Sequence, residues 1–114
     1  KIAYDVPQIY TAHNVKKQNQ FIELLQKAQD FREQIGGVHL WGKRKSETGR
    51  KVAHCGDLTS YFEGDLELKA LFLEQFNKTF DDDICRKMVL EVNSGNDDLT
   101  SIITDLRANG VRFV

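Results

Sequence analysis

Strand-like and helix-like segments alternate along this chain of 114 residues, and the alternation restricts the possible folds more than any other feature. Short runs rich in β-branched, aromatic and other apolar residues predict strands, at Val6–Ala12, 38–41 and 88–92. Apolar residues at spacings of three and four predict helices, at about 15–35, 66–76 and 99–106. Intervening helices imply parallel strands with right-handed crossovers. We therefore expect an α/β fold with three strand–helix units in one domain, residues 1–114.

Turn and capping residues suggest where these elements begin and end. Asn14 is a candidate N-cap of the first helix, Gly36 is its candidate stop, and Asp98 is the candidate N-cap of the last helix. The dipeptide Gly36-Gly37 predicts a turn before the second strand. Residues 111–114 either begin a further strand or form a docked tail.

Composition and charge exclude several classes of protein. Sixteen basic and seventeen acidic residues give a net charge of −1, which argues against a generally basic nucleic-acid binder and leaves room only for a local basic surface. The sequence has no apolar run of membrane-spanning length and no signal segment. We expect a cytoplasmic protein without a membrane partner, in which Cys55 and Cys85 are unpaired.

All three histidines and one unusual carboxylate fall near the predicted ends of strands. His13 follows the first strand, His39 lies near the end of the second, His54 follows the next loop, and Glu91 lies in the third. The carboxyl ends of parallel strands meet at one rim of such a fold. Imidazole and carboxylate groups together are typical ligands of zinc or manganese. We therefore predict a metal site formed by His13, His39, His54 and Glu91.

Glu91 is the strongest of these candidates, because an unpaired carboxylate inside the apolar run 88–92 would be costly to bury. We expect Glu91 and His54 to have catalytic roles. Other interpretations remain open: His13 caps the first helix, and His39 is a partly buried structural histidine. The sequence lacks the motifs of serine hydrolases, P-loop proteins and dinucleotide-binding proteins.

A basic segment leaves the predicted rim beside His39 and returns to it beside His54. As a flexible loop it would be either a solvated surface or a grip for an anionic substrate, and its cations are Lys43, Arg44, Lys45, Arg50 and Lys51. Trp41, just before it, either stacks on a base or packs in the interior. The acidic run 81–83 lies before the third strand and is expected to be a solvated turn.

The motifs Val38-His39-Leu40-Trp41, Val52-Ala53-His54-Cys55-Gly56-Asp57 and Val89-Leu90-Glu91-Val92 resemble the last strands of the xylose-isomerase-like TIM barrels. This superfamily includes AP endonucleases, UV-damage endonucleases and sugar isomerases or epimerases. The resemblance implies that His39, His54 and Glu91 are metal ligands, with His13 as a further one. The pattern departs from AP endonucleases at Tyr10 and Val52, where those enzymes have aspartate.

A complete barrel needs about 250 residues. The resemblance therefore implies the C-terminal part of a longer metal-dependent barrel enzyme, which alone would be inactive and would associate with its N-terminal half or with itself. The most favoured activity is hydrolysis of phosphodiesters at damaged DNA, because the basic segment suits DNA or another phosphate-bearing substrate. The alternatives are a sugar isomerase or epimerase of the same superfamily, and a metal-free α/β interaction domain.

Overall fold

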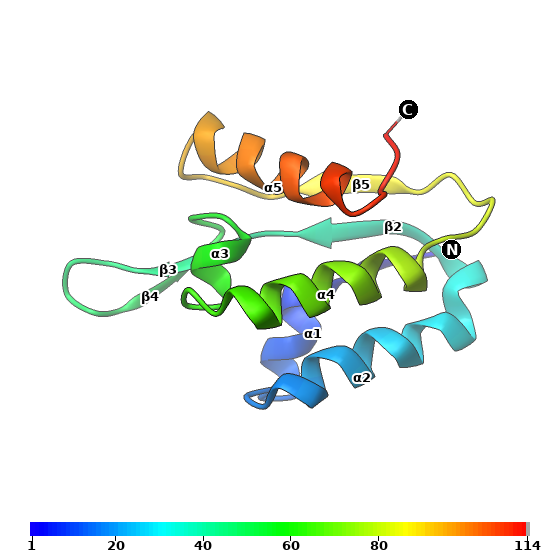
Figure 1. Cartoon of the computed structure of the whole chain (residues 1–114), viewed down its shortest axis with the longest axis horizontal. Helices are drawn as coiled ribbons and strands as arrows, with labels where there is room; N and C mark the ends of the chain where they lie inside the picture. The colour runs from blue at the N-terminus through cyan, green and yellow to red at the C-terminus, as the bar shows by residue number, and fades with distance from the viewer. Residues whose placement is uncertain (114) are drawn as a thin grey trace.

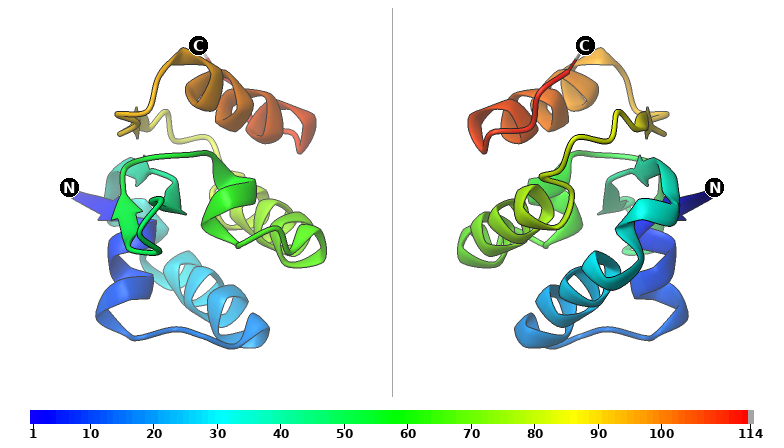
Figure 2. Two further views of the ribbon diagram at one scale, coloured as in Figure 1. Left: turned by 90° about the vertical axis from the view of Figure 1, so that its left-hand side faces the viewer. Right: turned by 90° about the vertical axis from the view of Figure 1, so that its right-hand side faces the viewer.

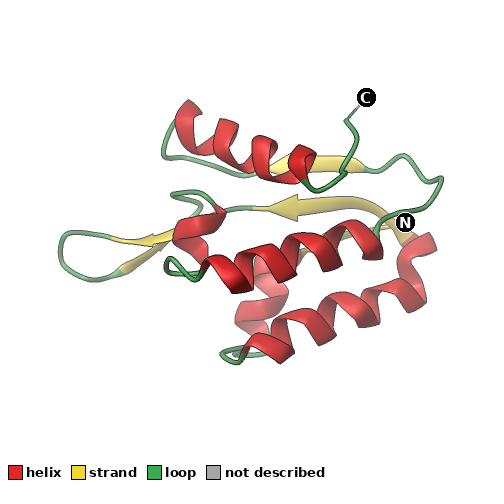
Figure 3. Cartoon of the chain, viewed as in Figure 1, coloured by secondary structure: helices red, strands yellow, loops and turns green. Residues whose placement is uncertain are grey.

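The computed structural model describes residues 1–113 of the chain. Its helices and strands, in chain order, are β1 (Ile2–Asp5), α1 (Val6–Ala12), α2 (Gln18–Ala28), the 3₁₀ helix η1 (Gln29–Gln34), β2 (Ile35–Leu40), β3 (Lys43–Lys45), β4 (Lys51–Ala53), α3 (Leu58–Tyr61), α4 (Leu66–Thr79), β5 (Lys87–Leu90) and α5 (Asn96–Ala108). Figures 1 and 3 show their arrangement.

The main sheet has the strand order β1-β2-β5, and each neighbouring pair is parallel, which confirms the predicted α/β class. In the register of this sheet, Val38 of β2 lies beside Tyr4 on one side and beside Met88 on the other. Helices α2, α4 and α5 lie on the same side of the three strands (Figure 2). The sheet therefore has one face covered by helices.

The hydrophobic core lies between that covered face and the helices. Val38 and Leu40 of β2 are buried there, together with Phe72 and Phe76, the largest fully buried side chains of α4. Burying an apolar side chain of this size contributes about 1.5–3 kcal/mol. Because side chains alternate along a strand, His39 lies on the opposite face. We call the face of β1, β2 and β5 that carries His39 the ligand face.

The segment Val6–Ala12, predicted as a strand, is the helix α1, and the first strand precedes it at Ile2–Asp5. Asp5 is the N-cap of α1, where its Oδ1 accepts a hydrogen bond from the Gln8 amide at 3.0 Å. Pro7 lies in the first turn, where its missing N–H costs nothing. The apolar residues Val6 and Tyr10 then lie one turn apart on the buried side. N-capping and helical spacing thus outweigh the β-propensity of this segment.

The predicted helix at 15–35 is shorter and starts later than expected. Helix α2 begins after its N-cap Lys17, whose amide donates to Gln20 Oε1 at 3.0 Å, and Asn14, with a left-handed φ of 50°, lies outside the helix. A kink at Phe31, with φ of −130°, interrupts η1.

The turn predicted at Gly36-Gly37 is not present, because both glycines lie within β2. A Cβ on Gly37 would lie 3.2 Å from the Lys87 carbonyl oxygen, so this glycine permits the close approach of β2 and β5.

The basic segment, predicted as a flexible loop, forms the antiparallel hairpin β3–β4, in which Arg44 lies opposite Val52. Figure 1 shows this hairpin projecting beyond the end of the main sheet. The predicted helices at 66–76 and 99–106 are present as α4 and α5, although Gly95 rather than Asp98 is the N-cap of α5. The short helix α3 was not predicted.

Residues 111–113 have no regular secondary structure, while Val111 and Phe113 pack against the core. Of the two alternatives predicted for residues 111–114, residues 111–113 form the docked tail. Val114 lies outside the described residues. Cys55 and Cys85 are free, as expected. Among the described residues, no helix combines the length and hydropathy needed to span a membrane.

A largely buried ion pair closes the end of the sheet at which β5 begins. The Arg86 side chain is 6% exposed and donates to both carboxylate oxygens of Asp82, each at 2.7 Å. It also donates to the carbonyl oxygens of Ile35 and Arg32 at 2.9 and 2.8 Å, which ties the 81–86 loop to the start of β2. The hydrogen bonds from Arg86 hold the pKa of Asp82 below its ordinary value. The predicted solvated turn at 81–83 therefore contains a structural carboxylate.

We predict that Asp82→Asn lowers the free energy of unfolding at pH 7 by about 3 kcal/mol, because Arg86 then remains buried without its counterion. A lowered pKa in the folded state means that Asp82 stabilises the protein above pH about 4 and that this contribution is lost as the pH falls below that value. Urea unfolding between pH 7 and pH 2 measures both effects.

The exposed neighbour Asp83 offers a matched control, and Asp83→Asn should leave the unfolding free energy within about 0.5 kcal/mol of wild type. If Asp82→Asn unfolds at the wild-type urea concentration throughout this pH range, the ion pair does not have the assigned role.

Candidate metal centre

Three acidic or imidazole side chains meet where the parallel strands end. Asp5 is the last residue of β1, His39 lies beside it in β2, and Glu91 follows β5 directly. The Glu91 amide donates to the Leu40 carbonyl oxygen at 3.0 Å, which continues the sheet pairing past β5. Strand alternation then puts Asp5, His39 and Glu91 on the ligand face, away from the core.

The three side chains lie close enough together to be candidate ligands of one ion. His39 Nδ1 and Glu91 Oε1 are hydrogen-bonded to each other at 2.8 Å, and His39 Nδ1 lies 3.9 Å from Asp5 Oδ2. One ligand atom from each residue lies within 4.8 Å of the others. The side chains of Asp5, His39 and Glu91 are 21%, 30% and 39% exposed, so the group is partly shielded and still accessible.

His54 approaches the same carboxylate from the turn after β4. Its Nε2 lies 3.8 Å from Glu91 Oε2. Its backbone has a left-handed φ of 62°, and its carbonyl oxygen accepts from the Asn93 amide at 2.7 Å. The same turn is anchored by a 2.7 Å hydrogen bond from the Gly56 amide to Ser94 Oγ. The loop after β5 thus holds both His54 and Glu91. These hydrogen bonds also maintain the left-handed backbone conformation of His54, which is unfavourable for a residue other than glycine.

His13 does not belong to this group, which corrects the prediction made for it. It is exposed and lies at the C-cap of α1, a whole helix beyond the end of β1. The prediction failed because Val6–Ala12 was taken as the strand. The residue at the true strand end is Asp5, which sequence reasoning missed. Its position before Val6-Pro7 is a helix-start signal that would have located both the helix and the strand end.

Trp41 forms part of the wall of the centre. It is 5% exposed, and its ring centroid lies 4.4 Å from that of His54. Lys43 Nζ lies 5.7 Å from the Trp41 ring and 5.6 Å from the Tyr61 ring. Burial, and then the neighbouring Lys51, lower the pKa of Lys43, whereas burial raises the pKa of Tyr61. Of the two interpretations of Trp41, the structure shows packing.

The cations of the hairpin differ in their surroundings. Arg44 lies 3.7 Å from Asp98, and Lys51 lies 3.2 Å from Glu63. The side chains of Lys45 and Arg50 are exposed. The hairpin therefore carries cations next to the candidate centre, although acids offset part of their charge.

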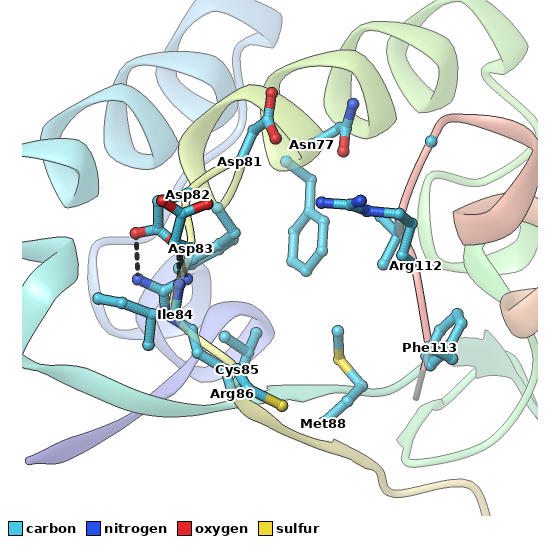
Figure 4. A pocket seen from close by; sticks show the side chains of 15 residues that line it. Asn77, Asp81, Asp82, Asp83, Ile84, Cys85, Arg86, Met88, Arg112 and Phe113 are labelled. Atoms are coloured by element: carbon cyan, nitrogen blue, oxygen red, sulfur yellow. Dashed lines mark hydrogen bonds and ion pairs between the residues drawn. The ribbon is translucent and has the colours of Figure 1, made fainter.

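None of Asp5, His39, His54 and Glu91 lines either of two cavities formed by the described residues. A cavity of about 510 Å³ is lined by Lys43, Lys51 and Tyr61 together with residues at the end of α1. A larger cavity of about 660 Å³ lies at the other end of the sheet. Figure 4 shows the Asp82–Arg86 pair on one of its walls and Arg112 and Phe113 on another. The larger cavity is thus remote from the histidines.

The donor set of Asp5, His39 and Glu91 fits a divalent ion of the zinc or manganese type, since it offers two carboxylates and one imidazole. His54 offers a further nitrogen close to Glu91. No family model, curated protein or solved structure matches this chain. The geometry of these residues is therefore the basis for inferring function.

We predict that Mn²⁺ or Zn²⁺ raises the melting temperature of the protein and that Glu91→Gln and His39→Ala remove this effect. An ion at 100 times its dissociation constant stabilises the folded state by about 2.7 kcal/mol, which corresponds to about 10 °C for a domain of this size. Thermal unfolding with and without the ion, followed by circular dichroism, measures the shift.

His13→Ala is the matched control, because it removes an exposed imidazole outside the group. It should keep the full ion-induced shift. Equal shifts in the wild type, Glu91→Gln and His39→Ala would place the ion elsewhere.

Proposed function

We propose that this chain carries the C-terminal part of a divalent-metal-dependent TIM-barrel enzyme that hydrolyses phosphodiesters in damaged DNA. The observation that carries the proposal is the convergence of Asp5, His39 and Glu91 at the carboxyl ends of parallel strands. Active sites of parallel α/β barrels lie at that end of the strands.

The arrangement of the strands and helices supports the barrel interpretation. β1 and β5 are the outer strands of the described sheet, and helices α2, α4 and α5 lie on one side of it (Figure 2). In a TIM barrel, helices likewise cover the outside of the strands, and further strands pair with each outer one. Additional strands beside β1 and β5 would close the ligand face into the interior of a barrel.

In this proposal, Asp5, His39 and Glu91 would hold the ion, and His54 would accept the proton of the water that attacks phosphorus as the bond from phosphorus to the leaving oxygen breaks. A divalent ion supplies Lewis acidity toward a phosphoryl oxygen and toward a water nucleophile. Oε2 of Glu91 lies 3.8 Å from His54 Nε2, which is too long for a hydrogen bond but close enough for the carboxylate to stabilise a protonated imidazole electrostatically. Glu91 and His54 would thus be the catalytic pair of this chain.

The hairpin is proposed to hold the phosphate backbone of the substrate. Lys45 and Arg50 are exposed on it, and Lys43 and Lys51 line the cavity of about 510 Å³ nearby. Contacts of lysine and arginine to phosphates dominate the affinity of such complexes and make it depend on salt. The hairpin would bind the substrate while the strand ends carry out the reaction.

A sugar isomerase or epimerase is the second candidate, and the ion pairs of the hairpin favour it. Asp98 and Glu63 lie within 4 Å of Arg44 and Lys51 respectively, and this reduces the positive charge offered to a polyanion. In this alternative, His39 and Glu91 would hold one ion across two oxygens of the sugar. Binding of DNA distinguishes the two candidates.

We predict that the full-length protein nicks duplex DNA containing an abasic site in the presence of Mn²⁺ and that Glu91→Gln abolishes the nicking. The double variant Lys45→Ala, Arg50→Ala should bind this DNA more weakly and should reduce the slope of log K against log salt by about 1.8, since each phosphate contact contributes about 0.9. Nicking assays and fluorescence anisotropy at several salt concentrations measure these effects.

Lys27→Ala, which removes an exposed lysine of α2, is the control and should retain the wild-type salt slope. Metal-linked stabilisation without any binding of abasic or nicked DNA would favour the sugar enzyme. Absence of both would favour a metal-free interaction domain.

A further inference from the structure

Trp41 contacts two members of the candidate metal centre, although it offers no metal ligand itself. Its Nε1 donates to both carboxylate oxygens of Asp5, to Oδ1 at 3.0 Å and to Oδ2 at 3.3 Å. Its ring packs against His54, with centroids 4.4 Å apart. Trp41 follows His39 by two residues, so it belongs to the same face of the sheet.

The hydrogen bonds to Asp5 determine which of its oxygens can face an ion. Oδ1 accepts both the Gln8 amide, as the N-cap of α1, and the Trp41 indole N–H. Oδ2 is the atom that faces His39, with Nδ1 at 3.9 Å. The Gln8 amide and the shorter bond from Trp41 hold Oδ1, and the longer bond from Trp41 reaches Oδ2, so the indole N–H fixes the plane of the carboxylate beside His39.

Trp41 cannot serve as a stacking platform for a substrate base, because only 5% of it is exposed. Tyr61 lies 6.3 Å from it between ring centroids, at an interplanar angle of 81°. Lys43 Nζ lies over both rings. The indole is thus held on several sides, and its N–H is directed at Asp5.

We propose that Trp41 is a positioning residue of the metal centre, whose indole N–H orients Asp5 and whose ring places His54. This inference rests on the proposed function, because it assumes that the Asp5, His39 and Glu91 group binds an ion. Partners that orient metal ligands from outside typically change metal affinity by 10- to 100-fold. Trp41 acts on the ion through Asp5.

A double-mutant cycle tests this role. Isothermal titration with Mn²⁺ compares the wild type, Trp41→Phe, Asp5→Gly and the double variant. Trp41→Phe removes the N–H and keeps an aromatic ring, and should weaken Mn²⁺ binding by about 10-fold. Glycine is nearly as good an N-cap as aspartate, so Asp5→Gly removes the carboxylate that accepts the indole N–H at little cost to α1. In the Asp5→Gly background, Trp41→Phe should change affinity by less than about 2-fold, because Trp41 then has no carboxylate to orient.

The outcomes separate this inference from the proposed function. If the wild type binds no Mn²⁺, the metal centre itself is wrong. If the wild type binds Mn²⁺ and Trp41→Phe binds it equally well, Trp41 has only a packing role and the inference is wrong while the metal centre stands. The same conclusion follows if Trp41→Phe lowers the unfolding free energy without changing affinity.

A second measurement uses only the wild-type protein. The chain has one tryptophan, so it has one indole N–H resonance. Saturation with diamagnetic Zn²⁺ should shift this resonance in the wild type, because the partner of the N–H then coordinates an ion. Saturation that leaves the indole resonance in place would overturn the role proposed for Trp41.

Discussion

The central position of β2 in the sheet is the constraint on which the rest of the structure depends. β2 pairs with β1 on one side and with β5 on the other, and all three strands are parallel. Alternation along it sends Val38 and Leu40 into the core, and His39 and Trp41 to the ligand face. Shifting the register by one residue would reverse both sets. The hydrophobic core and the candidate centre are therefore specified by the same pairing.

The two ends of the sheet have different roles in the described residues. At the end where β5 begins, the Asp82–Arg86 pair is nearly buried and is satisfied by backbone carbonyls, which is a stabilising arrangement. At the end where β5 finishes, Asp5, His39 and Glu91 are only partly buried. Polar groups that remain accessible are the ones able to meet a ligand. This separation allows the candidate centre to change without removing the contacts that hold the loops together.

Sequence reasoning located much of the candidate site because its residues have local signatures. Glu91 and His39 were identified from sequence alone, and the structure places both on the ligand face. The burial expected for Glu91 was wrong, because it follows β5 rather than lying within it and its side chain is 39% exposed. The assignment of His13 to the metal site was wrong and Asp5 was missed for the same reason, because α1 was predicted as a strand. Its β-branched and aromatic residues resemble a strand, but Asp5 caps it and Pro7 fits its first turn. Capping chemistry was the stronger local signal.

The sequence by itself determined the apolar periodicity of α4 and α5, because this depends on neighbours within a few residues. It also implied a parallel sheet, because helices intervene between the strands and a helical crossover joins parallel strands. Only the tertiary structure decided that the basic segment is a hairpin, that Gly37 lies within a strand, and that Trp41 donates to Asp5. The last two depend on contacts between segments distant along the chain, and the hairpin depends on the pairing of two strands rather than on the residues of either one. Such contacts are fixed by register and close packing, which no local pattern encodes.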